Sequence, residues 1–293
     1  MERVEFVFEG GSKADADTFM DQYREATMRT GGRDATLARM SIDTPFHPAL
    51  FADRTVVITG AGRGIGRAVA EAFHACGADV IAHAGRERGD LTDGERLTWL
   101  AADFLQRDEQ DRFAEIVLDR GDRVDVLVNN AGTMFGRFPA GSLSDADYDR
   151  VLELNQHAPV RLTRALLPAL TRAGARHGAA IVNTVSISAA TGGSPGSSIY
   201  SASKAFVSTW TRAMARELAP EGIRANAVSP GVIDTDFHQR YSSAEKLENT
   251  RRQIPLQRLG SAADCAPAYL FLASPALSGY ITGQVVEING GQR

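Results

Sequence analysis

A short β-branched strand that runs straight into a glycine-rich turn and then a helix limits the fold of this 293-residue chain more than any other feature. Thr55 to Thr59 has the length and character of one buried parallel strand. An alanine-rich helical segment follows from Ile65 to about Cys76, with Gly77 as its C-terminal cap. Glycines in such a turn let the backbone approach a pyrophosphate, and the helix N-terminus offers free N–H groups. The turn residues expected to contact a dinucleotide are Gly60, Gly62, Arg63, Gly64, Ile65 and Gly66.

This pattern predicts an α/β fold, a doubly wound parallel sheet of Rossmann type with helices on both faces. The spacing is T-G-x-x-x-G-x-G, and position 65 is isoleucine where the commoner G-x-G-x-x-G pattern has its last glycine. A glycine turn without a ligand is therefore the alternative.

The end of the second expected strand, Asp79 to about Ala84, bears on the choice of cofactor. Enzymes that prefer NAD commonly place a carboxylate there, where it binds the ribose 2′-hydroxyl. This chain has Arg86 there and no carboxylate before Glu87, while Arg63 lies in the glycine turn. Guanidinium groups bind phosphate through a two-pronged fork, so the sequence favours NADP(H), with NAD(H) as the alternative. Alternatively, both arginines are ordinary solvated charges.

Tyr200 and Lys204 lie four residues apart, which places them on one face of the helix expected from Ser198 to Leu218. A cation beside a phenol lowers its pKa, and such a tyrosine can pass a proton to or from a substrate oxygen. The pair alone is weak evidence, because most such pairs are surface residues.

Several motifs in a fixed order make the reading specific. The expected strand Val124 to Val128 ends in Asn129-Asn130-Ala131-Gly132, and the strand Ile181 to Ser186 precedes the Tyr-x-x-x-Lys pair. In this order the motifs resemble the short-chain dehydrogenase/reductase family, over residues 51–291. The nearest branch is the 3-oxoacyl-carrier-protein reductase-like one, which also contains sugar, polyol and ketone enzymes.

The resemblance implies a role for each matching residue. Tyr200 would be the general acid or base, Lys204 would lower its pKa and hold the nicotinamide ribose, and Ser186 would bind the substrate oxygen. The backbone carbonyl of Asn155 would hold a water that relays protons to the lysine. Asn129 would brace the central strands. The other implied cofactor contacts are Asp103 at the adenine, Asn130, Ala131 and Gly132 near the cofactor, and Pro230, Gly231, Ile233 and Thr235 beside the nicotinamide.

The serine departs from the family spacing. In the family the serine usually precedes the tyrosine by thirteen residues. Here Ser186 lies fourteen residues before Tyr200, and Ser188 lies twelve residues before it. We prefer Ser186 because it lies three residues after Asn183 at the strand end, and Ser188 is the alternative.

Asn155 lies on a helix expected from Ser144 to Leu170, with Ser144 and Asp147 spaced as a capping box. Pro159 should disturb this helix just after Asn155, because proline removes one backbone hydrogen bond. Free backbone groups near Asn155 would suit the proposed water relay.

The composition of the chain does not favour nucleic-acid binding, a membrane span or a metal site. A net charge of −4 gives no basic footprint for nucleic acid, and no run of eighteen apolar residues predicts a membrane span. The six histidines show no metal-binding spacing. The two cysteines, Cys76 and Cys265, fall in expected helices and fit core positions in a reducing, cytoplasmic compartment.

Residues 1–50 carry no family motif and read as an N-terminal extension to a catalytic domain at 51–293. The segment Asp15 to Met28 could form a short helix, and Met40 is a candidate for the true start; an arm that crosses to a neighbouring subunit is the alternative. The resemblance implies a homo-oligomer, a tetramer or dimer.

The polar segment at 233–259 is expected to select a hydroxylated or anionic small carbonyl or alcohol substrate. The alternatives are a 3-oxoacyl-carrier-protein reductase and a catalytically silent cofactor-binding protein.

Overall fold

The computed structural model describes residues 46–292, apart from the side chains of His238 and Gln239. The proposed start at Met40 and the short helix expected from Asp15 to Met28 lie outside the described residues. The described residues 46–292 belong to one compact unit. Within it, Phe46 and Leu50 pack against the core, so residues ahead of the boundary expected at position 51 contribute to this unit.

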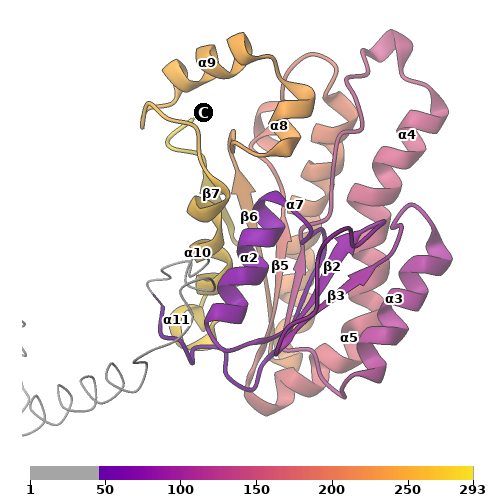
Figure 1. The fold of residues 1–293 in the computed structure, drawn as a ribbon, viewed down its shortest axis with the longest axis vertical. Helices are drawn as coiled ribbons and strands as arrows, with labels where there is room; N and C mark the ends of the chain where they lie inside the picture. The colour runs from indigo at the N-terminus through magenta and orange to yellow at the C-terminus, as the bar shows by residue number, and fades with distance from the viewer. Residues whose placement is uncertain (1–45, 293) are drawn as a thin grey trace, which may run out of the picture. The chain divides into compact units, whose positions relative to one another are not determined.

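A seven-stranded parallel sheet forms the centre of the molecule (Figure 1). Its order is β3-β2-β1-β4-β5-β6-β7, and every pairing is parallel. The strands are β1 (Thr55–Ile58), β2 (Asp79–Gly85), β3 (Leu97–Ala101), β4 (Val126–Asn129), β5 (Ala179–Thr184), β6 (Ile223–Pro230) and β7 (Val285–Ile288). The expected doubly wound α/β fold is confirmed, and the expected strands are found with boundaries that differ by about two residues.

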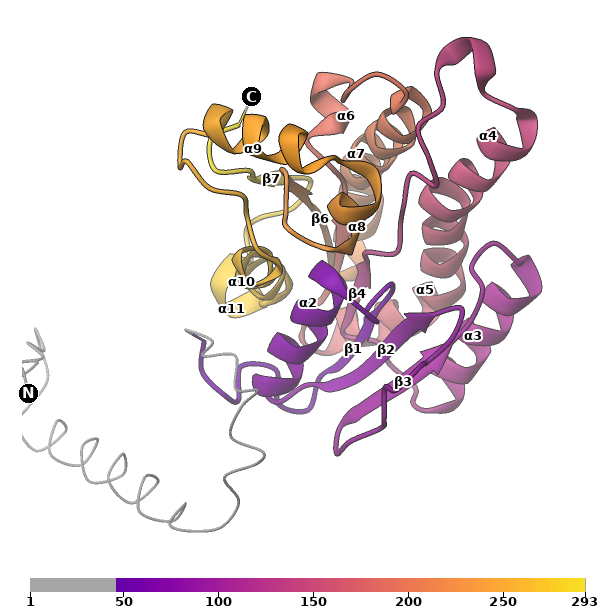
Figure 2. The same ribbon diagram turned by 45° about the horizontal axis from the view of Figure 1, so that its top comes forward.

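Helices cover both faces of the sheet, as Figure 2 shows from a second side. The helices are α2 (Gly64–Ala75), α3 (Arg107–Asp119), α4 (Asp145–Leu152), α5 (Ala158–His177), α6 (Ser188–Thr191), α7 (Ser198–Leu218), α8 (Asp236–Tyr241), α9 (Ala244–Gln253), α10 (Ala262–Ala273) and α11 (Pro275–Ser278), with 3-10 turns η1 (Ala140–Ser142) and η3 (Ala219–Glu221). Among the described residues, none of these helices is long and apolar enough to cross a bilayer.

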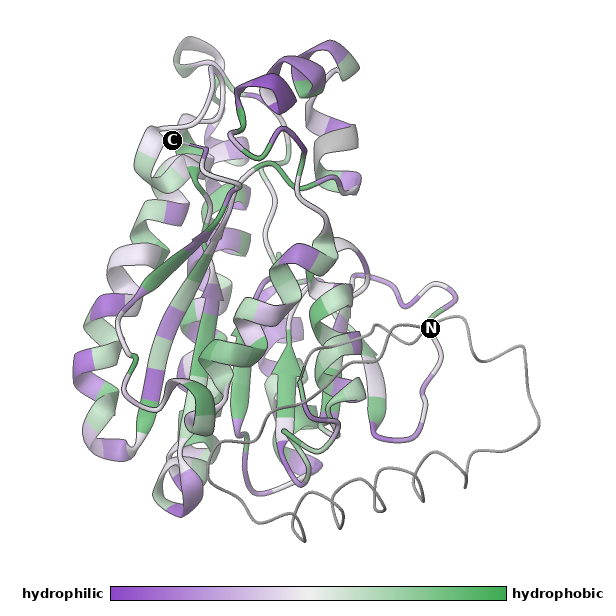
Figure 3. Cartoon of the chain, turned by 90° about the vertical axis from the view of Figure 1, so that its left-hand side faces the viewer, coloured by the Kyte–Doolittle hydropathy of each residue, from purple (hydrophilic) through white to green (hydrophobic). Residues whose placement is uncertain are grey.

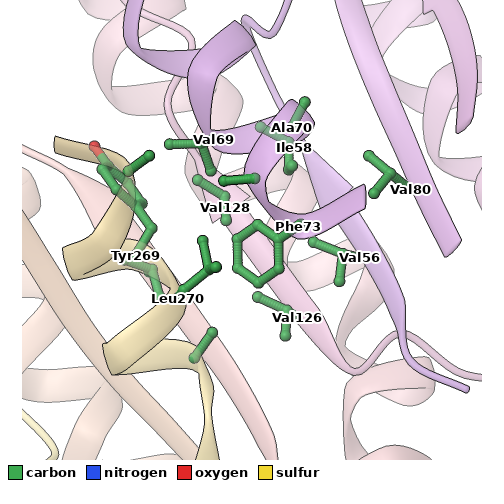
Figure 4. Packing of buried hydrophobic residues seen from close by; sticks show 14 of the residues in the cluster. Val56, Ile58, Val69, Ala70, Phe73, Val80, Val126, Val128, Tyr269 and Leu270 are labelled. Carbon is green, nitrogen blue, oxygen red and sulfur yellow. The ribbon is translucent and has the colours of Figure 1, made fainter. Parts of the chain in front are cut away.

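Two apolar cores, one on each face of the sheet, hold the helices in place. On one face α2 packs against α10, where Phe73 and Leu270 meet strand residues such as Val128 (Figure 4). On the other face Phe113 of α3 and Leu166 of α5 are buried against the sheet. The strands are mostly apolar, with polar interruptions such as Arg224 and Asn226 on β6, while the outer sides of the helices carry many polar residues (Figure 3).

The helix expected from Ser144 to Leu170 is present but is not uniform. The Ser144 hydroxyl accepts a hydrogen bond from the Asp147 N–H at 3.1 Å, so the expected cap is formed. A π-helical turn, η2 (Glu153–His157), separates α4 from α5 just before Pro159, as the proline predicted. The helix then runs to His177, beyond the expected end at Leu170, because Ala173 is still buried against the sheet.

The order of strands places a site at one edge of the sheet. The chain moves outward in opposite directions from β1, to β2 on one side and to β4 on the other. In parallel sheets such a reversal leaves a crevice at the carboxyl ends of the strands, where ligands bind. The glycine turn follows β1 at this edge, and α6, α8 and α9 gather above it (Figure 2).

Candidate active site

Tyr200 and Lys204 lie one turn apart on α7, whose bounds, Ser198–Leu218, match those expected. Lys204 is 3% exposed, and its ammonium donates a hydrogen bond to the Thr184 carbonyl at the end of β5, at 2.9 Å. Burial lowers the pKa of Lys204 to about 8, so this group can exchange protons close to neutral pH. Helix α7 therefore brings the Tyr–Lys pair to the carboxyl edge of the sheet.

The pKa of Tyr200 shifts in the direction opposite to the one expected from Lys204. Burial raises it to about 12, and a hydrogen bond with Ser186 opposes that rise. The lysine has little effect because its nitrogen lies 6.0 Å from the centre of the phenol ring and points to Thr184. The phenol consequently carries its proton at neutral pH, which is the form that a proton donor needs.

The choice between the two serines follows from their contacts. Ser186 forms the hydrogen bond with Tyr200, and its hydroxyl also accepts one from the Ser188 N–H at 3.1 Å. Ser188 begins the short helix α6, and its own hydroxyl lies near Gly193. Ser186 is therefore the serine that the fold places beside the phenol, as the sequence analysis preferred.

Asn155 sits on the π-helical turn with its side chain directed at the loop after β4. Its amide nitrogen donates to the Thr133 and Val151 carbonyls, both at 2.8 Å, and its side-chain oxygen accepts no hydrogen bond from the described residues. A Cβ placed on Gly132 would lie 2.7 Å from that oxygen and 2.9 Å from the Lys204 nitrogen. Gly132 thus leaves space between an unpartnered buried acceptor and a buried ammonium, a polar niche that a ribose hydroxyl or a water fits.

Close packing explains most of the glycines in the dinucleotide turn. A Cβ on Gly62 would lie 2.3 Å from the Ala84 carbonyl oxygen, and one on Gly66 would lie 2.2 Å from the Gly60 carbonyl oxygen. Gly60 and Gly64 have φ angles of 64° and 55°, in the left-handed region. Ile65 is half-buried and packs against the core beneath the turn.

The N-terminus of α2 has the features of an anion-binding site. Arg63 occupies its N-cap position without a capping hydrogen bond from its side chain, and the first turn contains no acidic residue. The first N–H groups of a helix have no partner within the helix, and the helix dipole favours negative charge there. A 12-residue helix of this kind behind a glycine turn fits the pyrophosphate of a dinucleotide.

The sequence analysis missed a buried histidine that holds the glycine turn. The Gly60 N–H donates to Nδ1 of His83 at 3.1 Å, so Nε2 carries the ring proton and donates to the Ala102 carbonyl at 2.9 Å. The ring stacks on Phe104 with centroids 3.9 Å apart. Burial lowers the pKa of His83 to about 4, which keeps Nδ1 free as an acceptor. A histidine inside an otherwise apolar strand was the available signal.

Thr59 and Asn130 also support the turn. The Thr59 hydroxyl accepts hydrogen bonds from the Asn130 and Ala131 N–H groups, both at 3.0 Å. The Asn130 side chain donates to the Gly60 carbonyl at 3.0 Å and accepts from Thr184. The side chain of Asn130, expected to contact the cofactor, is therefore engaged by the protein, because the tight turn leaves carbonyls that need donors.

Asn129 braces neighbouring strands, as expected. Its amide nitrogen donates to Asn183 on β5 at 2.9 Å and to Thr163 on α5 at 3.1 Å.

The two arginines expected at the 2′-position both face carboxylates. Arg86 pairs with Asp103 at 2.9 Å, and Arg63 lies 3.8 Å from Asp236. Asp103, expected at the adenine, thus supplies the carboxylate that the local sequence around Arg86 lacks. The Arg86 side chain is 68% exposed, so this pair is weak and can be exchanged for another anion.

The segment after β6 closes the site beside the glycine turn. Pro230 ends β6, the Gly231 N–H donates to the Ile288 carbonyl at 2.9 Å, and Ile233 is buried in the core. Thr235 approaches the turn, since a Cβ on Gly64 would lie 3.5 Å from its side chain. The fold therefore places the Thr235 side chain beside the glycine turn, within reach of a dinucleotide bound there.

Two aromatic rings on α8 form a series of contacts that ends at Tyr200. The Phe237 ring is 5.9 Å from that of Tyr200, and the Tyr241 ring is 5.0 Å from that of Phe237. The Tyr241 hydroxyl shares a hydrogen bond of 3.1 Å with Thr133 in the loop after β4. Helix α8 thus lies against both Tyr200 and the loop after β4.

Comparisons with known proteins agree with this geometry. A family model described as enoyl-(acyl carrier protein) reductase matches residues 60–293. Nodulation protein G of Rhizobium sp. (strain N33) is 38% identical over 243 residues, which cover 81% of this chain and 96% of that protein.

Solved structures extend the similarity to cofactor complexes. A 3-ketoacyl-(acyl-carrier-protein) reductase from Brucella melitensis, complexed with NADH, is similar with a TM-score of 0.74 and 33% identity, over 82% of this chain and 98% of that one. A candidate NAD(P) dependent gluconate 5-dehydrogenase from Beutenbergia cavernae, with bound NADP at low occupancy, has a TM-score of 0.76 and 34% identity, over 83% and 98% of the two chains.

The fold and site together define an oxidoreductase that uses a nicotinamide cofactor on CH–OH and C=O groups. The chain belongs to the short-chain dehydrogenase/reductase family.

Proposed function

We propose that this protein is an NADP(H)-dependent reductase of small polar carbonyl compounds, of the sugar, polyol or keto acid type. The observation that carries the proposal is the Tyr200–Ser186 hydrogen bond beside the buried ammonium of Lys204. These groups meet at the edge of the sheet where the glycine turn lies, so a carbonyl at the phenol can also reach a dinucleotide.

A bound nicotinamide supplies the hydride in reduction and accepts it in oxidation. Tyr200, protonated at neutral pH, donates its proton to the carbonyl oxygen as negative charge develops there. Ser186 donates a second hydrogen bond to the same oxygen. Lys204, with a pKa of about 8, would return a proton to the phenolate through a water in the niche beside Gly132, and it would regain its own proton from solvent. The side-chain oxygen of Asn155 can accept a hydrogen bond from that water.

The preference for NADP(H) rests on Arg86 and on open space beside it. A Cβ on Gly85, at the end of β2, would meet no atom within 4 Å, so a 2′-phosphate has room there. The phosphate would take over the exposed guanidinium of Arg86 from Asp103. NAD(H) is the alternative, since Asp103 could bind a ribose hydroxyl while Arg86 stays paired with it.

A 3-oxoacyl-carrier-protein reductase is the second candidate. The name of the Brucella melitensis structure favours it. The net charge of −4 speaks against it, because an acidic carrier protein needs a basic docking surface.

We further propose a homo-oligomer in a reducing, cytoplasmic compartment. Phe206 on α7 is 38% exposed and stacks on Trp210, and Tyr148 on α4 is 40% exposed. Exposed aromatic side chains on these helices fit an interface between subunits. Cys76 and Cys265 are buried and form no disulfide, which suits a reducing environment.

The test combines cofactor titration with turnover of a Tyr200→Phe variant. We expect tighter binding of NADPH than of NADH, and in Arg86→Ala a loss confined to NADPH. The Tyr200→Phe variant should bind cofactor normally yet reduce ketones at least about a hundredfold more slowly, because the proton donor is missing. Tighter NADH binding would overturn the cofactor proposal. Turnover above about a tenth of the wild-type rate would place the proton donor elsewhere.

A further inference from the structure

Three aromatic rings, those of Tyr200, Phe237 and Tyr241, contact one another in succession. A pair of basic side chains lies beyond the last of them. Arg137 follows β4, and Lys246 lies in the first turn of α9. Both donate to a single neutral acceptor, the Ser194 hydroxyl, at 2.8 Å from Arg137 Nη1 and 3.1 Å from Lys246 Nζ. Two cations therefore converge on one oxygen at the rim of the site.

No carboxylate balances these two charges among residues 46–292. Neither Arg137 nor Lys246 has an acidic oxygen within ion-pair distance there, whereas Glu248, the nearby acid on α9, is taken by Arg251 and Arg252. Burial and the charge of Arg137 lower the pKa of Lys246. The protein thus holds two like charges together without compensation, an arrangement that an anion would relieve.

The basic pair is joined to the reaction centre by the elements that should touch the substrate. Arg137 donates to the Tyr241 carbonyl at 2.9 and 3.1 Å, so it holds α8 against the loop after β4. The rings of Tyr241 and Phe237 lead from there to Tyr200. The ring centres are 5.9 and 5.0 Å apart in succession along this path, which calls for an extended carbon chain between carbonyl and carboxylate.

We propose that Arg137 and Lys246 form a subsite for a carboxylate on the substrate, whose carbonyl lies at Tyr200. This inference rests on the proposed function and narrows its substrate to a keto acid or oxidised sugar acid. The carboxylate takes the place of the Ser194 hydroxyl between the two cations and forms charge-assisted hydrogen bonds with both. Arg137 also orients α8, whereas Lys246 contributes charge alone.

The experiment measures equilibrium binding by isothermal titration to the full chain saturated with oxidised cofactor, which permits no turnover. The probes are 5-oxohexanoate, 7-oxooctanoate and 9-oxodecanoate, each paired with its methyl ester, so that the set covers a range of carbonyl–carboxylate separations. The ester keeps the ketone and removes the charge. We expect at least one acid to bind about tenfold more tightly than its ester.

In Lys246→Gln the ratio of acid affinity to ester affinity should fall below about threefold. Only the affinity for the acid should weaken, because the uncharged ester does not interact with the charge of Lys246. Arg252→Gln is the matched control, since it removes one positive charge from the same helix at a residue that is already paired with Glu248. It should leave the ratio unchanged.

Equal binding of acid and ester in all three pairs would overturn the subsite, as would a ratio that survives Lys246→Gln. The outcome is independent of turnover: a chain that selects acids but reduces no ketone would keep the subsite and refute the proposed function. A chain that reduces ketones without preferring acids would do the opposite.

Discussion

The buried histidine beneath the glycine turn makes the stability of the protein depend on pH in a way that can be calculated. Folding lowers the pKa of His83 from 6.5 to about 4, chiefly by burial, against smaller opposing effects of the Ala102 carbonyl and Asp103. Below pH 6.5 the unfolded chain binds a proton at His83 that the folded chain does not. The free energy of unfolding therefore falls as the pH falls from 6.5 towards 4, and this contribution is constant above 6.5.

The size of the effect follows from the shift. At about 1.4 kcal/mol per unit, the full difference is roughly 3 kcal/mol, of which about 2 kcal/mol is lost by pH 5. A His83→Phe variant keeps the stacking on Phe104 but cannot titrate. It leaves the Gly60 N–H and the Ala102 carbonyl without their partner, at a cost of about 2 kcal/mol that is independent of pH.

The assay is urea unfolding of wild type and His83→Phe at pH 7.5 and pH 5. At pH 7.5 we expect the free energy of unfolding of the wild type to exceed that of the variant by about 2 kcal/mol. At pH 5 we expect the two proteins to have about the same free energy of unfolding. Comparing the two proteins cancels the titration of all other groups. A stability gap that stays the same at both pH values would refute the argument, because His83 would then have no lowered pKa in the folded chain.

Three further predictions test the geometry of the site. Gly132→Ala should reduce kcat at least about tenfold with little change in Tm, since its Cβ would meet Asn155 and Lys204; Gly121→Ala, which meets no atom within 4 Å, is the control. Ser186→Ala should lower kcat about a hundredfold while Ser188→Ala stays near wild type, and equal effects would contradict the assignment of the serine. Phe206→Asp should reduce the oligomer to smaller species in sedimentation, and a wild type that is already monomeric would exclude the interface.

The sequence predicted what local patterns determine. Strand, glycine turn and helix at Thr55–Cys76 predicted the fold class, and the helix expected from Ser198 to about Leu218 is found as α7. Pro159 predicted a disturbance of the helix just after Asn155, and the structure has a π-helical turn at Glu153–His157. Each of these features depends on neighbours within a few residues along the chain.

Features that depend on contacts across the fold could not be predicted. Arg86 appeared to lack a carboxylate because Asp103 reaches it from the end of the neighbouring strand β3. The pKa of Tyr200 was expected to fall, yet burial raises it, and depth of burial cannot be deduced from spacing on a helix. The meeting of Arg137 with Lys246 joins segments more than a hundred residues apart.

The π-helical turn makes the length of its helix a chemical requirement. Such a turn holds about one residue more than an α-helical turn, so the segment Glu153–His157 contains a one-residue insertion that the surrounding fold absorbs. Removing one residue between Glu153 and His157 would restore ordinary α-helical winding and rotate the polar side chain of Asn155 by about 100°. The apolar residues of α5 could still cover the sheet, but the niche beside Gly132 would lose its acceptor. A single-codon deletion here would thus spare the architecture and disable the enzyme.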